Sequence, residues 1–206
     1  MGKPWNTGRK ELRKRTVRRV LILCEDGKSS RDYLASFPFD KQQVEITCVG
    51  TGMSTDRLAR EAVTYKNKAI KWKEPYQRIW IVFDRDEASA QQFGRAFELC
   101  GSHPEITACW SNECFELWYL LHYHLRDTAI GRQEIFREVS KLMECRYDKA
   151  DGKPFEKLKS KLNDALQNAL RLEMQNRKLG EERRNPSTNV HELVQFLRRF
   201  DPEHQR

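Results

Sequence analysis

Two hydrophobic patterns alternate along the first 130 residues. Short runs of mostly apolar residues are typical of buried strands, and longer segments with apolar residues every three or four positions are typical of helices. The short runs predict strands at residues 17–24, 43–49, 78–83 and 105–110. The periodic segments predict helices at about residues 31–37, 55–72, 88–100 and 113–122. This alternation predicts an α/β fold in which a mostly parallel four-stranded sheet is flanked by helices.

From about residue 131 the pattern is helical only. It predicts helices at residues 133–144, about 155–179 and 190–200, with a polar loop at 180–189 that supplies a capping Ser or Thr. The chain therefore divides into a basic flexible arm (1–16), an α/β core (17–130) and a C-terminal helical extension (131–206). At 206 residues we expect these parts to form one domain, with the extension packed on the core.

Acidic residues follow the predicted strands. Glu25 comes directly after the first strand, Asp84 and Asp86 follow the third, and Glu116 lies just beyond the fourth. The carboxyl ends of parallel strands meet at one edge of a sheet, where ligands bind. Crowded carboxylates repel one another unless a cation such as Mg²⁺ or Mn²⁺ neutralises them. The alternative is that each strand simply ends in a solvated polar turn, but three coincident acidic ends favour a metal site.

The positive charge of the chain indicates a polyanionic partner. The formal net charge is +8, and residues 9–19 hold seven positive charges against one negative. A second basic block spans residues 157–184. These clusters are either solvated surface or contacts to nucleic acid, and their presence beside a predicted metal site favours nucleic acid. The candidate contacts in the arm and near the acidic residues are Arg13, Lys14, Arg15, Lys28, Arg31 and Arg85.

Other classes of protein are disfavoured. No apolar run approaches the ~20 residues that span a bilayer, and the basic N-terminus lacks the apolar core of a signal peptide, so we expect a cytoplasmic protein without membrane contact. The six cysteines include no Cys-x-x-Cys pair and predict reduced thiols rather than a zinc site. His122 lies six residues after Glu116 and is predicted to be a packed residue rather than a catalytic one.

Several motifs resemble known families. A strand followed by Glu25-Asp-Gly-Lys28, and another followed by Asp84-Arg-Asp86, resemble the catalytic Toprim domain of topoisomerases, bacterial primases and OLD-type nucleases. The chain more closely resembles the RloB family of proteins associated with phage defence, through residues 21–29, 83–86, 111–122 and 185–194. It departs from that pattern at Glu113, where the family has Pro and where we expect the start of a helix, and at Asp26-Gly27, where Gly-Glu is usual.

The resemblance implies a metal-dependent endonuclease that cleaves tRNA, other RNA or DNA in anti-phage defence. Glu25, Asp84 and Asp86 would bind Mg²⁺ or Mn²⁺, Glu116 would be a further ligand or a general base, and Lys28 and Lys149 would contact phosphate. Toprim defence nucleases often act beside an ATPase, and this chain has no Walker A motif of its own. A partner ATPase, or another component of a defence system, and a homodimer are therefore further expectations.

Two other functions stay open. The chain could be a non-catalytic sensor or adaptor that binds a partner ATPase, a phage product or nucleic acid, with its acidic residues serving the structure. It could also perform nucleotidyl transfer of the primase type, although the sequence contains no obvious nucleotide-holding module beyond the Toprim-like core.

Overall fold

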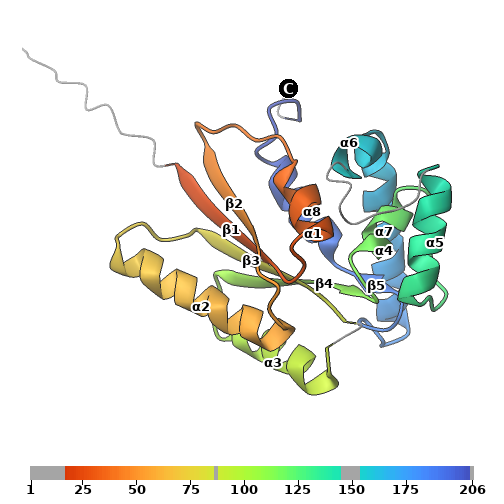
Figure 1. The fold of residues 1–206 in the computed structure, drawn as a ribbon, viewed down its shortest axis with the longest axis horizontal. Coiled ribbons are helices and arrows are strands. Elements are labelled where there is room, and N and C mark those ends of the chain that lie inside the picture. The colour runs from red at the N-terminus through yellow and green to blue at the C-terminus, as the bar shows by residue number, and fades with distance from the viewer. Residues whose placement is uncertain (1–16, 86–87, 145–153, 205–206) are drawn as a thin grey trace, which may run out of the picture.

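The computed structural model describes residues 17–85, 88–144 and 154–204, and they form a twisted sheet between two layers of helices (Figure 1). The strand order is β2-β1-β3-β4-β5. The strands are β1 (Arg18–Cys24), β2 (Val44–Gly50), β3 (Arg78–Asp84), β4 (Ile106–Asn112) and β5 (Ser187–Thr188). The first four strands pair in parallel, and β5 runs antiparallel to β4. The predicted α/β fold and mostly parallel sheet are thus confirmed.

The predicted number of four strands was wrong. The fifth strand contains only Ser187 and Thr188, which is too short for an alternating hydrophobic pattern to reveal. The sequence predicted a capping Ser or Thr in this loop, and the Thr188 hydroxyl accepts a hydrogen bond from the Val190 amide (3.2 Å), the first amide of α8 (Val190–Arg198). The same hydroxyl donates to the Trp110 carbonyl (2.9 Å), and this contact helps to hold β5 beside β4.

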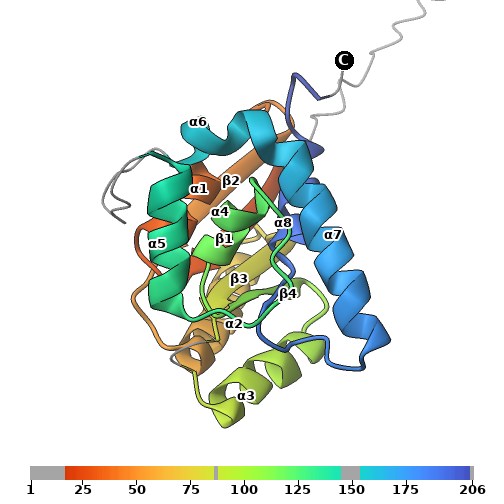
Figure 2. The ribbon, with the colours of Figure 1, turned by 90° about the vertical axis from the view of Figure 1, so that its right-hand side faces the viewer.

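Most predicted helices are present, with shifts at their ends. They are α1 (Ser29–Ala35), α2 (Thr55–Lys71), α3 (Ala90–Gly101), α4 (Glu116–Leu121), α5 (Arg132–Leu142), α6 (Pro154–Leu158), α7 (Leu162–Lys178) and α8, with a short 3-10 turn, η1 (Lys159–Lys161), between α6 and α7. The helix expected at 155–179 is broken because α6 packs on α1, whereas α7 packs on α4 (Figure 2).

Two predicted helix starts were also wrong. The first helix, α1, begins at Ser29 rather than at about residue 31, because the Asp26 carboxylate before it accepts hydrogen bonds from the Lys28 amide (2.6 Å) and the Ser29 hydroxyl. Glu113 does not begin α4, which starts three residues later. Its carboxylate instead accepts a hydrogen bond from the Asn185 side chain (2.6 Å), so Glu113 helps to join the end of β4 to the C-terminal region.

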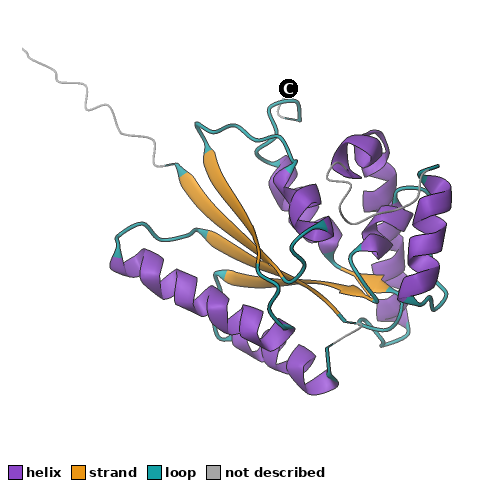
Figure 3. Ribbon diagram, viewed as in Figure 1, coloured by secondary structure: helices purple, strands orange, loops and turns teal. Residues whose placement is uncertain are grey.

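Helices lie on both faces of the sheet (Figure 3), and alternate side chains of a strand point to opposite faces. One face packs against α2 and α3 through Leu21, Leu23, Ile79, Ile81 and Phe83. The other packs against helices that include α1, α4 and α8, through Val20, Ile22, Trp80, Val82 and Cys109. Both faces of the central strands are therefore buried, as the continuous apolar runs predicted.

The C-terminal residues complete the core as well as extending it. Helices α5 and α7 pack on α4, and α8 returns to cover β4. The residues of α8 that face inward, Val190, Leu193, Val194 and Leu197, are at most 1% exposed. Among the described residues, Cys24, Cys48, Cys100, Cys109 and Cys114 are free thiols. No helix within the described residues is long and apolar enough to cross a membrane.

Candidate active site

The structure brings Glu25 and Asp84 together at the carboxyl edge of the sheet. They follow and end the neighbouring strands β1 and β3, and the Glu25 amide donates to the Val82 carbonyl (2.8 Å), which extends the pairing by one residue. Glu25 Oε2 then accepts hydrogen bonds from the Asp84 amide (3.3 Å) and the Thr55 hydroxyl (3.2 Å). The two acidic residues are therefore neighbours through direct hydrogen bonding, at the common edge where the sequence predicted that the parallel strands end.

Glycines let the loops that carry Glu25 approach β2 closely. A Cβ atom on Gly50 would overlap the Cα of Gly27, so only glycine fits at the end of β2. The following loop is tied to the same place, because the Gly52 amide donates to the Glu25 carbonyl (3.0 Å). Gly52 itself has φ +65°, a conformation that side chains disfavour. These contacts fix the position of the Glu25 backbone.

An open cleft of 460 Å³ lies over these two residues. Its walls include residues from the first turns of three helices: Thr55 of α2, Gln92 of α3 and Arg132 of α5. Helix N-termini carry partial positive charge and unpaired amide groups, which favour anions such as phosphate. The lining residues are Glu25, Asp26, Gly27, Gly52, Met53, Ser54, Thr55, Asp84, Ala88, Gln92 and Arg132.

Arg132 is the charged residue of this cleft that the sequence did not single out. Its guanidinium lies 3.9 Å from the Asp84 carboxylate, and the two side chains are 27% and 15% exposed. Arg132 is the first residue of α5, in the region predicted only as a helical extension. It places a permanent positive charge beside the acidic pair.

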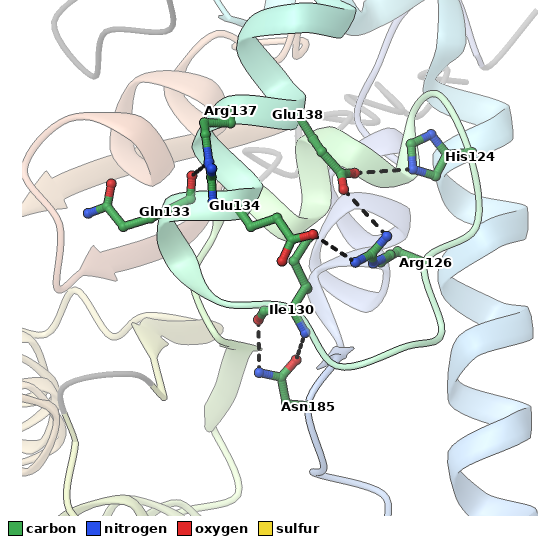
Figure 4. A network of polar contacts seen from close by, with 8 residues as sticks. All are labelled: His124, Arg126, Ile130, Gln133, Glu134, Arg137, Glu138 and Asn185. Carbon is green, nitrogen blue, oxygen red and sulfur yellow. Dashed lines mark hydrogen bonds and ion pairs between the residues drawn. The ribbon is translucent and has the colours of Figure 1, made fainter.

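A polar network holds the start of α5 in place (Figure 4). The Asn185 side chain accepts from the Ile130 amide (3.1 Å) and donates to the Ile130 carbonyl (2.9 Å). Arg126 pairs with Glu134 and Glu138 of α5, at 3.4 Å in each case. The loop before α5 is therefore fixed at both ends, and Arg132 is held over the cleft.

Glu116 lies close to the cleft but is not among its lining residues. Its side chain is fully buried at the start of α4. Burial raises the pKa of the neighbouring Cys114 thiol, a hydrogen bond with Glu116 and the negative charges of Glu116 and Asp84 raise it further, and Arg132 lowers it. Glu116, Asp84 and Arg132 thus all lie near the Cys114 thiol. Burial favours a positioning role for Glu116, and its predicted role as ligand or base stays a prediction.

Of the basic residues predicted to contact phosphate, Arg31 and Arg85 have other partners in the structure. Lys28 is exposed and is not among the residues that line the cleft. Arg31 pairs with Asp32 (3.1 Å). The Arg85 guanidinium donates to the Ala88 carbonyl and lies over the Phe93 ring, 5.3 Å from its centroid. Of the predicted contacts, Arg13, Lys14, Arg15 and Lys149 lie outside the described residues, as does the predicted ligand Asp86.

The donor atoms of the cleft suit a hard cation. Within residues 17–85, 88–144 and 154–204, no group of three or more His, Cys, Asp or Glu side chains is arranged to hold a metal ion. Glu25 and Asp84 supply oxygen donors, which Mg²⁺ and Mn²⁺ prefer. Burial raises the pKa of the nearby thiols of Cys24 and Cys114, which keeps them neutral and unsuited to bind a metal. The described residues therefore fit a hard cation with two carboxylates.

By its fold and cleft, the protein is an α/β protein with an acidic site at the carboxyl edge of a parallel sheet. The family model described as RloB-like protein matches residues 20–197, and the chain therefore belongs to the RloB-like family. Comparison with curated proteins and with solved structures found no match.

Proposed function

We propose that this chain is a Mg²⁺- or Mn²⁺-dependent endonuclease that hydrolyses phosphodiester bonds of nucleic acid as an effector of anti-phage defence. One observation carries the proposal: Glu25 and Asp84 converge under an open cleft where three helices begin. Carboxylates suit a cation, and helix N-termini suit the phosphate that the cation would accompany. The Toprim-like spacing of Glu25, Asp84 and Asp86 supports the same reading.

Four described residues of the cleft have a part in this proposal. Glu25 and Asp84 would hold the cation, with Asp86 as the third ligand that the sequence predicts. A bound divalent cation supplies positive charge that polarises a phosphoryl oxygen. Arg132 would bind another phosphate oxygen, for which a planar guanidinium is well suited. Thr55 orients Glu25 through its hydroxyl group.

The substrate and partners belong to the proposal as well. The net charge of +8 and the basic residues of the arm favour a polyanion, either tRNA or other RNA, or DNA. A partner ATPase, or another component of a defence system, would control the activity, and the chain could act as a homodimer.

The direct test compares the wild type with Asp84→Asn and with Asp164→Asn, a control on exposed α7 residue Asp164. Each protein is incubated with total tRNA and with plasmid, in Mn²⁺ and in EDTA. We expect Mn²⁺-dependent cutting by the wild type and the control, and a loss on the order of 10²–10³-fold or more in Asp84→Asn, with nucleic-acid binding retained. Cutting by Asp84→Asn at the wild-type rate would remove the mechanism.

The ion pair between Arg132 and Asp84 favours a second candidate function. Arg132 balances part of the acidic charge without any cation, which is what a purely structural acidic cluster requires. The chain would then be a non-catalytic sensor or adaptor for an ATPase, a phage product or nucleic acid. Such an adaptor would bind its partner equally well in Mn²⁺ and in EDTA, and it would cut neither substrate.

A further inference from the structure

A second surface combines aromatic and basic side chains at the far end of α2 from the candidate active site. The segment 64–78 contains Lys66, Lys68, Lys71, Lys73 and Arg78 against the single acidic residue Glu74. Three aromatic residues are interleaved with these charges: Tyr65, Trp72 and Tyr76. In Figure 1, α2 runs along the sheet, and this end of it lies beside the start of β3.

The aromatic residues border a small pocket. It has a volume of 190 Å³, less than a drug-sized ligand needs and suited to one flat ring. Its lining residues are Arg19, Tyr65, Lys68, Ala69, Trp72 and Tyr76, which we call the Trp72 surface. The Arg19 guanidinium stacks over the Tyr76 ring, 4.7 Å from its centroid, so one wall of the pocket is itself a planar cation–π pair.

The Trp72 side chain lies on the surface rather than in the core. It is 70% exposed, whereas Trp80 and Trp118 are 5% and 0% exposed in the core. The backbone at Trp72 is nevertheless held firmly, because the Lys73 amide bonds to the Ile70 carbonyl (3.0 Å) and the Glu74 amide to the Ala69 carbonyl (2.9 Å). These are the two hydrogen bonds of a Schellman motif, with Lys73 at φ 59°. The ring is thus presented to solvent from a rigid helix end.

The positive charge around this ring is available to a ligand. Arg19 is balanced by Glu45 and Glu74, each at 3.5 Å. The side chains of Lys68, Lys71 and Lys73 are all exposed. The strand β1, which follows the basic residues 9–16 in sequence, also begins at this end of the sheet. Exposed lysines around a pocket lined by aromatic rings match the chemistry of a nucleic-acid base and its flanking phosphates.

We infer that the Trp72 surface binds a single-stranded segment of nucleic acid. One base enters the pocket and stacks on Trp72, and the phosphates on either side contact Lys68, Lys71 and Lys73. A protein partner or a membrane would need a larger apolar area than the isolated side chains of Ile70 and Trp72 provide. This inference goes beyond the proposed nuclease function, because the binding requires neither a cation nor cleavage.

The geometry also predicts a dependence on length. Helix α2 has 17 residues and is therefore about 25 Å long, with Thr55 at the acidic cleft and Trp72 at the other end. A strand that touches both places must extend over roughly seven or eight stacked nucleotides at about 3.4 Å each. Short oligonucleotides can occupy only one of the two places.

The test measures binding of labelled single-stranded oligonucleotides of about 5 and about 30 nucleotides by fluorescence polarisation, in EDTA so that nothing is cut. The variants are Trp72→Ala, the conservative Trp72→Phe, and the triple variant Lys68→Ala/Lys71→Ala/Lys73→Ala. The control for Trp72 is Leu179→Ala, because Leu179 is also a large hydrophobic residue on the surface and is 57% exposed. The control for the lysines is Lys41→Ala/Lys141→Ala/Lys178→Ala, which removes three positive charges from other exposed positions. Circular dichroism establishes that each variant is folded.

We expect Trp72→Ala to weaken binding of the longer strand on the order of 5- to 100-fold, with Trp72→Phe near the wild type. The lysine variant should weaken binding and reduce its dependence on salt more than the lysine control does. Equal affinities for Trp72→Ala and Leu179→Ala would overturn the inference. Failure of the nuclease proposal would instead leave these affinities unchanged.

Discussion

Replacing Arg132 by alanine should change metal affinity and cleavage in opposite directions. At the observed 3.9 Å, two unit charges attract by about 4 kcal/mol at an effective dielectric constant of 20. Exposed ion pairs contribute only about 0.2–1 kcal/mol once solvent screens them. Arg132 and Asp84 are 27% and 15% exposed, so we expect about 1 kcal/mol. Removing the guanidinium should therefore strengthen Mn²⁺ binding by about fivefold, since 1.4 kcal/mol corresponds to tenfold.

Cleavage should weaken in the same variant. If Arg132 binds a phosphate oxygen during the reaction, its loss should slow cleavage on the order of 10²–10³-fold even with the metal site saturated. Isothermal titration with Mn²⁺ and single-turnover cutting separate the two effects. Arg137→Ala is the control, because Arg137 lies on the same helix but is exposed and, among the described residues, bonds the Gln133 carbonyl. Slower cleavage together with weaker Mn²⁺ binding would show that Arg132 does not compete with the cation for Asp84. Equal effects of the two substitutions would rule out a specific role of Arg132.

Three further predictions concern the framework of the site. Gly50→Ala must displace Gly27, so we expect a loss of about 1–3 kcal/mol in stability together with impaired cleavage, and a wild-type melting temperature would contradict the close approach. Asn185→Ala removes the hydrogen bonds that fix the start of α5 and should destabilise by about 1–3 kcal/mol, unlike the exposed control Asn67→Ala. Burial lowers the pKa of His122 from 6.5 to about 4, so the unfolded chain takes up more protons between these pH values. Stability should be full above pH 6.5 and fall by about 3 kcal/mol as the pH drops to 4, and His122→Gln should flatten this part of the urea-unfolding profile.

The sequence predicted the parts of the site that depend on strands. Continuous apolar runs such as Ile79–Phe83 mark strands that are buried on both faces, and the rule that parallel strands end at one edge placed Glu25 near Asp84. Arg132 could not be found in this way. It lies 48 residues after Asp84 and begins a helix whose position depends on the network around Asn185, which no local pattern records.

The side of a helix that faces the cleft is equally hard to predict. The sequence placed Glu116 close to the acidic residues, but its full burial in α4 depends on how that helix packs beneath α5 and α7. The Trp72 surface is a different case. Its alternating lysines and aromatic residues are visible in the sequence, but Trp72 marked the end of a predicted helix, and its exposure became clear only in the structure.

Anomalous diffraction from crystals grown with MnCl₂ tests the claim that Glu25 and Asp84 bind a divalent cation. We expect a manganese peak within about 2.2 Å of carboxylate oxygens from both Glu25 and Asp84, and loss of that peak in Asp84→Asn crystals grown in the same way. A fully ordered cleft without a peak in the wild type, or a peak that binds neither residue, would contradict the claim.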